Sequence, residues 1–312
     1  MNILLTGSTG FVGKELLKRA FIYRRVMRGR DNNGNNHSPS EYYIEALNSS
    51  TTWNGAFDNV DCIIHLAALA HNENHTLSDY NEVNLRGTLH LANEASKSGV
   101  KRFVFVSSIG VNGRSTKNNP FTSNDISKPQ SAYAQSKYDA ELGLKKISEK
   151  TGLEIVIIRP TLVYGSNAPG KFGMLTKLVK ISPILPFGLA SNRRDFISVE
   201  NLSDLLITCA IHPNAAGHTF LASDGNTVSI KEFTNEIAKG LGKKVIQFPI
   251  PISFMRFIGK VIGKSVLIEQ LFGNLEVDSS NIEGILGWTP PFTMMQSMAN
   301  LRDLGGNDDT YN

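Results

Sequence analysis

The sequence predicts an α/β protein, a doubly wound parallel sheet with a smaller carboxyl-terminal lobe. Short apolar runs alternate with helical patterns over the first half of the chain, as they do when helices cover both faces of a parallel sheet. Three glycines follow the first run directly and precede the first helical pattern. The chain has 312 residues, which is enough to bury one such domain and a smaller lobe.

The expected elements alternate in chain order. Apolar runs of strand length predict strands at 3–6, 25–28, 62–66, 103–107 and 155–159. Apolar residues at helical spacing predict helices near 11–23, 80–98 and 132–150. The stretch 31–39 is rich in asparagine with glycine and serine, so it predicts a polar loop.

The glycines stand in the turn Thr6-Gly-Ser-Thr-Gly-Phe-Val-Gly13. Strand, glycine turn and helix in this order form the dinucleotide-binding arrangement of the Rossmann fold, because the glycines let the backbone approach a pyrophosphate that sits on the helix amino terminus. A glycine turn can also serve strand-helix packing alone. The strand and helix on either side favour the cofactor.

Tyr133 and Lys137 stand four residues apart on an expected helix, so both side chains project from one face. A phenol beside an ammonium group can act as an acid and base near neutral pH, since a nearby positive charge favours phenolate. The pair alone would occur by chance on many surface helices. Together with the glycine turn, it predicts an oxidoreductase-type site.

Composition narrows the function class. The formal net charge is +4, with cations spread among acids, which suits small anionic ligands better than nucleic acid. No apolar run approaches the ~20 residues of a membrane span, and the first strand begins at Asn2 without a basic, apolar leader, so we expect a cytoplasmic protein. Cys62 and Cys209 are expected as reduced core residues, and the seven histidines show no metal-ligand spacing, so no metal is expected.

Several motifs in order resemble the extended short-chain dehydrogenases/reductases, and within them the NAD-dependent epimerase/dehydratase family of UDP-sugar 4-epimerases and 4-ketoreductases. Beside the glycine turn and the Tyr133/Lys137 pair, the motifs are Asp61-Cys-Ile-Ile-His-Leu-Ala-Ala68, Asn84-Leu-Arg-Gly-Thr88, Phe103-Val-Phe-Val-Ser-Ser108, Arg159-Pro-Thr-Leu-Val-Tyr-Gly165 and Arg194-Asp-Phe-Ile-Ser-Val199.

The resemblance implies a division of the chain. Residues 1–165 would form the dinucleotide-binding Rossmann domain, to which 191–218 return. Prolines and glycines break the chain into short pieces after Gly165. Residues 166–190 and 219–312 would form the substrate-binding lobe.

The resemblance also implies site residues. Ser108 stands 25 residues before Tyr133, the family's spacing between the catalytic hydroxyl and the tyrosine. Tyr133 would transfer a proton to or from a sugar oxygen, Ser108 would bind that oxygen, and Lys137 would hold the nicotinamide ribose while lowering the tyrosine pKa. A strand-end cap is the alternative role of Ser108. The cofactor-binding set comprises Gly7, Thr9, Gly10, Phe11, Val12, Gly13, Arg28, Leu66, Ala67, Ala68, Tyr133, Lys137 and Pro160.

The end of the second strand bears on the cofactor. An acid there would take the ribose hydroxyls of NAD, whereas an arginine accommodates the 2′-phosphate of NADP. The chain offers Arg28 first, then Arg30, and Asp31 only afterwards. This order of residues predicts NADP as the cofactor, with NAD as the alternative. If these arginines bind no cofactor, they form a solvated cluster of charges in a loop.

Three departures from the family bear on the reaction or on cofactor binding. Ile109 and Gly110 replace the acidic pair of 4,6-dehydratases, which argues against that activity. Leu162 replaces the asparagine with which many epimerases contact the nucleotide diphosphate, so Arg194, at the family's phosphate-contacting position, would carry that contact. Ala46 and Leu47 stand where an aspartate usually reaches the adenine.

The leading interpretation is an enzyme that reduces a UDP-4-keto-6-deoxy-hexosamine at C4 for surface-polysaccharide synthesis. A UDP-hexose 4-epimerase, acting on UDP-glucose or UDP-GlcNAc, is the alternative, and a cofactor-binding protein without turnover is the alternative of another class. Helices 80–98 and 132–150 are candidates for a homodimer interface. The apolar stretch 249–264, with spaced cations and two glycines, predicts a lobe helix packed on the cofactor domain, with a membrane-surface helix as the alternative.

Overall fold

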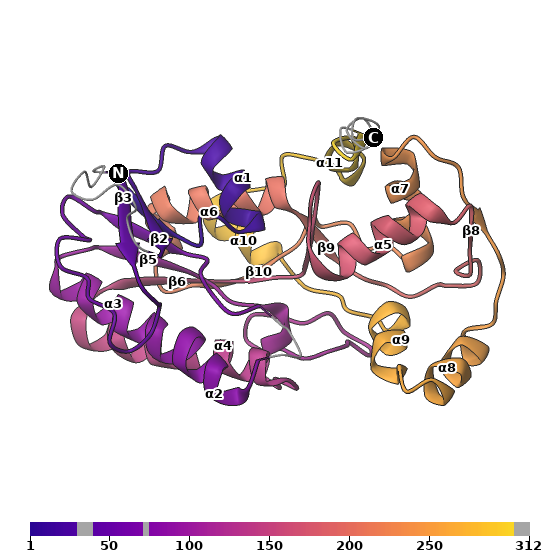
Figure 1. Ribbon diagram of the computed structural model, residues 1–312, viewed down its shortest axis with the longest axis horizontal. Helices are drawn as coiled ribbons and strands as arrows, with labels where there is room; N and C mark the ends of the chain where they lie inside the picture. Colours follow the sequence, from indigo (N-terminus) through magenta and orange to yellow (C-terminus); the bar gives the residue numbers. More distant parts are fainter. Residues whose placement is uncertain (30–39, 71–74, 303–312) are drawn as a thin grey trace.

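Seven strands form one sheet in the computed structural model, which describes residues 1–29, 40–70 and 75–302 (Figure 1). All paired neighbours are parallel, in the order β10-β6-β5-β4-β1-β2-β3. The strands are β1 (Ile3–Thr6), β2 (Arg24–Arg28), β3 (Glu41–Ile44), β4 (Cys62–His65), β5 (Arg102–Val106), β6 (Glu154–Pro160) and β10 (Thr219–Ala222). The order reverses between β1 and β4, where open parallel sheets bind ligands. The predicted fold class is confirmed.

Successive strand residues pack into different clusters on the two faces of the sheet. In β6, Val156 and Ile158 belong to one cluster, whereas Ile155 and Ile157 belong to the other. This period of two follows from strand geometry, and a strand buried on both faces needs apolar residues at every position.

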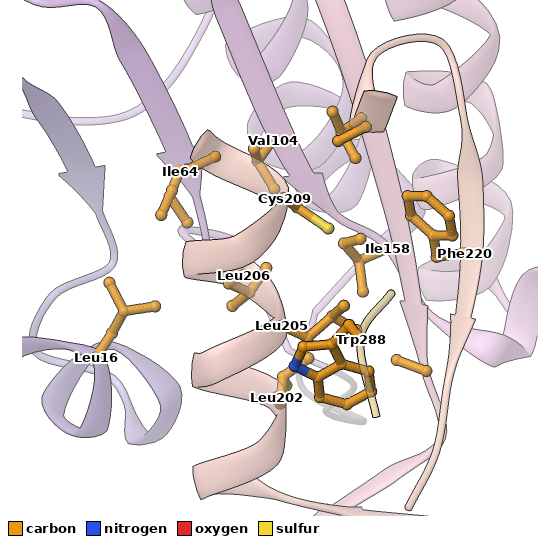
Figure 2. Packing of buried hydrophobic residues seen from close by; sticks show 14 of the residues in the cluster. Leu16, Ile64, Val104, Ile158, Leu202, Leu205, Leu206, Cys209, Phe220 and Trp288 are labelled. Atoms are coloured by element: carbon orange, nitrogen blue, oxygen red, sulfur yellow. The ribbon is translucent and has the colours of Figure 1, made fainter. Parts of the chain in front are cut away.

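Helices α1 (Phe11–Arg19), α6 (Val199–Ile211) and α10 (Ser280–Leu286) cover one face. Figure 2 shows Leu202, Leu205 and Leu206 of α6 against the strands, with Leu16 of α1 on one side and Trp288 on the other. Cys62 and Cys209 are free and fully buried in this cluster. Their predicted role as reduced core residues is confirmed.

The other face carries α2 (Leu77–Tyr80), a π-helix at Asn81–Gly87, α3 (Thr88–Lys97) and α4 (Ala132–Thr151). The helix expected near 80–98 is therefore divided by a π turn. Asn84 in that turn is fully buried, and its side-chain amide bonds both the N–H (2.8 Å) and the carbonyl (3.1 Å) of Leu69. This contact ties the helix to the loop after β4.

A second core lies in the lobe. The lobe comprises α5 (Gly170–Ile181), α7 (Ile230–Gly240), α8 (Ile252–Val261), α9 (Ser265–Phe272), α11 (Met294–Ala299) and the parallel pairs β7 (Leu162–Tyr164) with β9 (Phe196–Ser198) and β8 (Ile184–Leu185) with β11 (Ile246–Gln247). Phe196 stacks on Phe233 with ring centroids 3.8 Å apart. Two single turns, Ile109–Val111 and Pro213–Ala215, complete the described elements.

The structure differs from the sequence-based expectations at several elements. Strands β3 and β10 were not predicted from the sequence. The helix expected near 11–23 ends at Arg19 because Ala20 is extended. Arg30 and the expected loop 31–39 lie outside the described residues.

Two pieces of the segment 219–312, expected in the lobe, lie on the sheet instead. Strand β10 pairs with β6, and α10 and Trp288 join the cluster on the α6 face. Apolar side chains of β10, α10 and Trp288 pack into the core on the α6 face of the sheet, which residues 1–165 alone would leave partly uncovered.

Helix α8 also differs from its expected place on the cofactor domain. It packs on α9, where a Cβ at Gly259 would lie 2.6 Å from Cγ1 of Ile268. Glycine allows this close approach, and Figure 1 shows both helices at the end of the molecule away from the sheet.

Candidate active site

The glycine turn has the geometry of a phosphate cradle. Gly7 has a φ of +75°, and a Cβ there would lie 2.8 Å from the backbone nitrogen of Ala67. Helix α1 starts after Gly10 with no capping side chain, so its first-turn N–H groups are available to an anion. A Cβ at Gly13 would lie 2.2 Å from the Gly7 carbonyl oxygen, so this glycine serves packing of the helix on the turn.

A cavity of about 330 Å³ adjoins this turn. Seven residues of the predicted cofactor set line it: Gly7, Thr9, Gly10, Arg28, Leu66, Ala67 and Ala68. Val12 and Pro160 instead line a second cavity, and Phe11 packs against the lobe core. The first cavity therefore lies at the glycine turn that precedes α1.

Arg28 ends β2 and lines this first cavity together with Ala46 and Leu47. The lining residues that the structure describes include no aspartate or glutamate. The end of the cavity beside β2 therefore presents a cation.

The second cavity, of about 440 Å³, brings together residues that are far apart in sequence. Ser108, Tyr133, Pro160 and Arg194 of the predicted set line it. Residues of α9 close its far side, among them Val266 and Leu271. Lys137 lies beside the cavity rather than in its wall.

Ser108 follows β5 and has an extended backbone. Its Oγ accepts a hydrogen bond from the N–H of Gly110 at 3.1 Å, so it caps the short turn that follows. The same residue lines the second cavity. Capping uses an acceptor lone pair and leaves the hydroxyl proton for a ligand oxygen.

The Tyr133 phenol packs edge-on to Tyr80, with ring centroids 6.1 Å apart. Burial, with the Tyr80 phenol nearby, raises the pKa of Tyr133 to about 12. Tyr133 is therefore a protonated phenol at neutral pH in the protein without ligands. The expected lowering of this pKa by Lys137 is not what the structure shows.

Lys137 turns its ammonium group toward the end of β5, which explains that difference. Its Nζ donates to the carbonyl of Val106 at 2.9 Å and lies 4.6 Å from the centroid of the Phe105 ring. The side chain is 2 % exposed, and burial lowers the pKa of Lys137 to about 7, with Glu141 opposing this effect.

His65, at the end of β4, was not singled out by the sequence. Its Nδ1 lies 2.7 Å from Oγ1 of Thr6, and its Nε2 lies 2.9 Å from Oγ1 of Thr88. Burial and the nearby Lys137 lower the pKa of His65 to about 3, so the ring is neutral. Because Thr6 Oγ1 also accepts from the N–H of Ala67, this bridge holds the base of the glycine turn.

Three cations line the second cavity: Arg114, Lys171 and Arg194. Burial lowers the pKa of Lys171, and the charges of Arg194 and Arg114 add to that lowering. Arg194 donates to the carbonyl of Gly273 at 2.8 Å, and burial lowers its pKa to about 10. The described lining residues of this cavity include no carboxylate, so an anionic ligand would relieve the repulsion among the three.

Arg114 and Lys171 were missed from the sequence. Arg114 lies in an irregular segment and Lys171 in the first turn of α5, and neither belongs to a motif that would mark it.

The sheet, the glycine turn and the Tyr133/Lys137 helix define an extended short-chain dehydrogenase/reductase. The chain belongs to the NAD dependent epimerase/dehydratase family, whose model matches residues 3–222. It is accordingly an enzyme of the NAD(P)-dependent type.

Relatives and solved structures are similar over nearly the whole chain. A UDP-glucose 4-epimerase of Vibrio cholerae is 41 % identical over 306 residues, 95 % of this chain and 92 % of that protein. An N-acetyl-alpha-D-glucosaminyl-diphospho-ditrans,octacis-undecaprenol 4-epimerase of Escherichia coli O157:H7 is 26 % identical over 95 % of this chain and 93 % of that protein. The crystal structure of a UDP-N-acetylglucosamine 4-epimerase from Bacillus cereus has a TM-score of 0.76 and 18 % identity, covering 97 % of this chain and 99 % of that one.

Proposed function

We propose that this enzyme is a 4-epimerase of a UDP-activated hexose or N-acetylhexosamine. The observation that carries the proposal is the second cavity, where Ser108 and Tyr133 share a wall with three cations. The first two suit a sugar hydroxyl, and the cations suit a diphosphate. The similarity to the Vibrio cholerae UDP-glucose 4-epimerase supports the same activity.

The residues would divide the work as follows. Tyr133 as phenolate, the form that the positive charge of an oxidised nicotinamide ring nearby would favour, takes the proton of the C4 hydroxyl as that carbon gives up its hydride, and the resulting phenol returns the proton when the hydroxyl forms again. Ser108 donates a hydrogen bond to the same oxygen. Lys137, one helical turn beyond Tyr133, would hold the nicotinamide ribose. A nicotinamide ring, held with its dinucleotide by the glycine turn and the first cavity, supplies the acceptor and donor of hydride.

The position of the cations supports epimerisation in particular. Inversion at C4 needs a ketosugar that can present either face while it stays bound. Arg114, Lys171 and Arg194 would anchor the diphosphate and leave the uncharged sugar free to turn.

Reduction of a UDP-4-keto-6-deoxy-hexosamine is the second candidate, and Arg28 favours it. A cation at the end of β2 suits the 2′-phosphate of NADP, the usual cofactor of biosynthetic reductions. Leu162, which lines the second cavity where many epimerases have asparagine, points the same way. Epimerisation needs an oxidised nicotinamide ring, which NAD and NADP both supply. A preference of Arg28 for the 2′-phosphate therefore does not decide between epimerisation and reduction.

One pair of incubations separates the candidates. The purified enzyme is given UDP-glucose or UDP-GlcNAc with no added cofactor, and in parallel a UDP-4-keto-6-deoxy-hexosamine with NADPH. An epimerase interconverts the C4 epimers in the first incubation without a net change in absorbance at the NADPH band. Consumption of one NADPH per ketosugar, with no epimer formed in the first incubation, would replace the proposal with the reductase.

A homodimer through α3 and α4 stays a prediction for measurements in solution. Among the described residues, no helix combines the length and the apolar character needed to cross a membrane.

A further inference from the structure

One segment of the lobe is basic and contains no acid. Residues 241–268 contain five lysines and arginines and no aspartate or glutamate. This segment includes β11, α8 and the start of α9. Figure 1 shows α8 and α9 at the end of the molecule away from the sheet.

Helix α8 is apolar on two faces. Ile252 and Met255 are half-buried and pack on the lobe core. Phe254, Phe257, Ile258 and Val261 follow the i, i+3, i+4, i+7 pattern of a single face and are 53, 63, 39 and 70 % exposed. Packing within the protein therefore accounts for only one of the two apolar faces.

The exposed face extends to the residue after α8, because Ile262 is 57 % exposed. An exposed apolar surface of this kind on a folded protein usually marks an interaction site. We call the exposed side chains of Phe254, Phe257, Ile258, Val261 and Ile262 the α8 face.

Cations flank the α8 face. Lys260 on α8 and Lys264 at the start of α9 are both exposed. Arg256 on α8 forms an ion pair with Glu269 at 2.8 Å. Glu269 is the first acid after residues 241–268. Exposed phenylalanines beside lysines are typical of helices that lie in the interface of an anionic bilayer.

We propose that the α8 face docks on a bilayer surface that contains anionic phospholipid. Phe254 and Phe257 would enter the headgroup region, and Lys260 and Lys264 would contact lipid phosphates. A second copy of the chain fits this face less well, because two apposed copies would bring their lysines together with no acid in residues 241–268 of either copy to pair with them.

Helix α9, which packs on α8, connects the α8 face with the second cavity. Val266, on the first turn of α9, is 55 % exposed and also lines the second cavity with Tyr133 and Arg194. Docking through α8 would therefore hold this cavity close to the membrane surface. The docking proposal does not depend on which C4 reaction the enzyme performs.

Vesicle sedimentation tests the proposal on the full-length protein. Vesicles of phosphatidylglycerol with phosphatidylcholine are compared with vesicles of phosphatidylcholine alone. We expect wild-type protein to partition onto the anionic vesicles and Phe254→Gln/Phe257→Gln to lose roughly tenfold or more in partition coefficient. Lys260→Glu/Lys264→Glu should lose a similar factor.

Matched controls remove residues of the same kind from other surfaces. Phe21 and Ile126 are both 81 % exposed, so Phe21→Gln/Ile126→Gln should bind vesicles like wild type, as should Lys145→Glu/Lys146→Glu on α4. Unchanged thermal melting and dinucleotide binding show that the variants are folded.

Three results would overturn the proposal. They are failure of the wild-type protein to bind anionic vesicles, equal binding by the phenylalanine variant, and a solution dimer that this variant abolishes while vesicle binding is absent. The last result would assign the face to self-association.

Discussion

Glu141 and Arg159 form a buried ion pair beneath the candidate active site. The guanidinium contacts both carboxylate oxygens, with Nη2–Oε2 at 2.5 Å and Nε–Oε1 at 3.0 Å, and the side chains are 1 and 4 % exposed. Ser107 donates to Glu141 at 2.5 Å, and Arg159 donates to Asn112 at 2.9 Å. The pair thus joins α4 to the segment after β5 that carries Ser108.

We expect Glu141→Gln to be strongly destabilising, because it leaves the Arg159 charge buried without its partner. The free energy of unfolding, measured with urea, should fall by about 3–5 kcal/mol. The double variant Glu141→Leu/Arg159→Met should lose less than either single variant. Glu94→Gln, which breaks an exposed pair with Lys97, serves as the control and should cost at most about 1 kcal/mol. A loss as small as the control would show that the buried pair is dispensable.

Tyr133→Phe should lower kcat by about 10²-fold or more while leaving the fold and dinucleotide binding unchanged, because it removes only the proton that is transferred. Steady-state kinetics on a UDP-sugar measures the effect. Tyr138→Phe, on the same helix, is the matched control and should stay near wild type. Comparable turnover in the two variants would exclude Tyr133 as the acid and base.

Lys137→Met should change how stability depends on pH. The unfolded chain carries a proton on Lys137 at pH values below about 10.5, whereas the folded protein carries it only below about pH 7. This group therefore destabilises the wild-type fold progressively as pH falls through that window. The stability of the variant relative to wild type should rise by up to about 1 kcal/mol per pH unit between pH 10 and pH 7.

Urea unfolding of both proteins across this range provides the measurement, and the exposed-site variant Lys145→Met provides the control. The lost bond to the Val106 carbonyl adds a difference of its own to the variant. A gap between the two proteins that does not move with pH would mean that Lys137 is protonated in the folded state throughout.

Arg28→Ala should weaken NADP(H) binding by about 1–3 kcal/mol, the range of a hydrogen bond to a charged group. NAD(H) binding to the same variant should change little, because NAD lacks the 2′-phosphate. Calorimetric titration of both cofactors measures the two affinities. Equal losses for both would show that Arg28 does not distinguish them, and Arg30 would be substituted next.

Local features of the sequence predicted the fold and many of the residues that line the two cavities. The glycine turn could be recognised from sequence because its strand, turn and helix are adjacent in the chain. Some residues could not be predicted because their roles depend on contacts between distant segments. They are Arg114, Lys171 and the Glu141–Arg159 pair. The direction of the Tyr133 pKa was also wrong from sequence, since burial and the orientation of the Lys137 ammonium group decide it.

The way β10 and α10 return to the sheet limits how the chain can be divided. A fragment that ends at residue 165 would lack α6, β10 and α10, and would leave one apolar face of the sheet bare and β6 as an unprotected edge. Residues 1–165 are therefore not expected to fold as an independent domain. Exchanges between members of this family should succeed only for internal segments of the lobe whose two ends both rejoin the sheet.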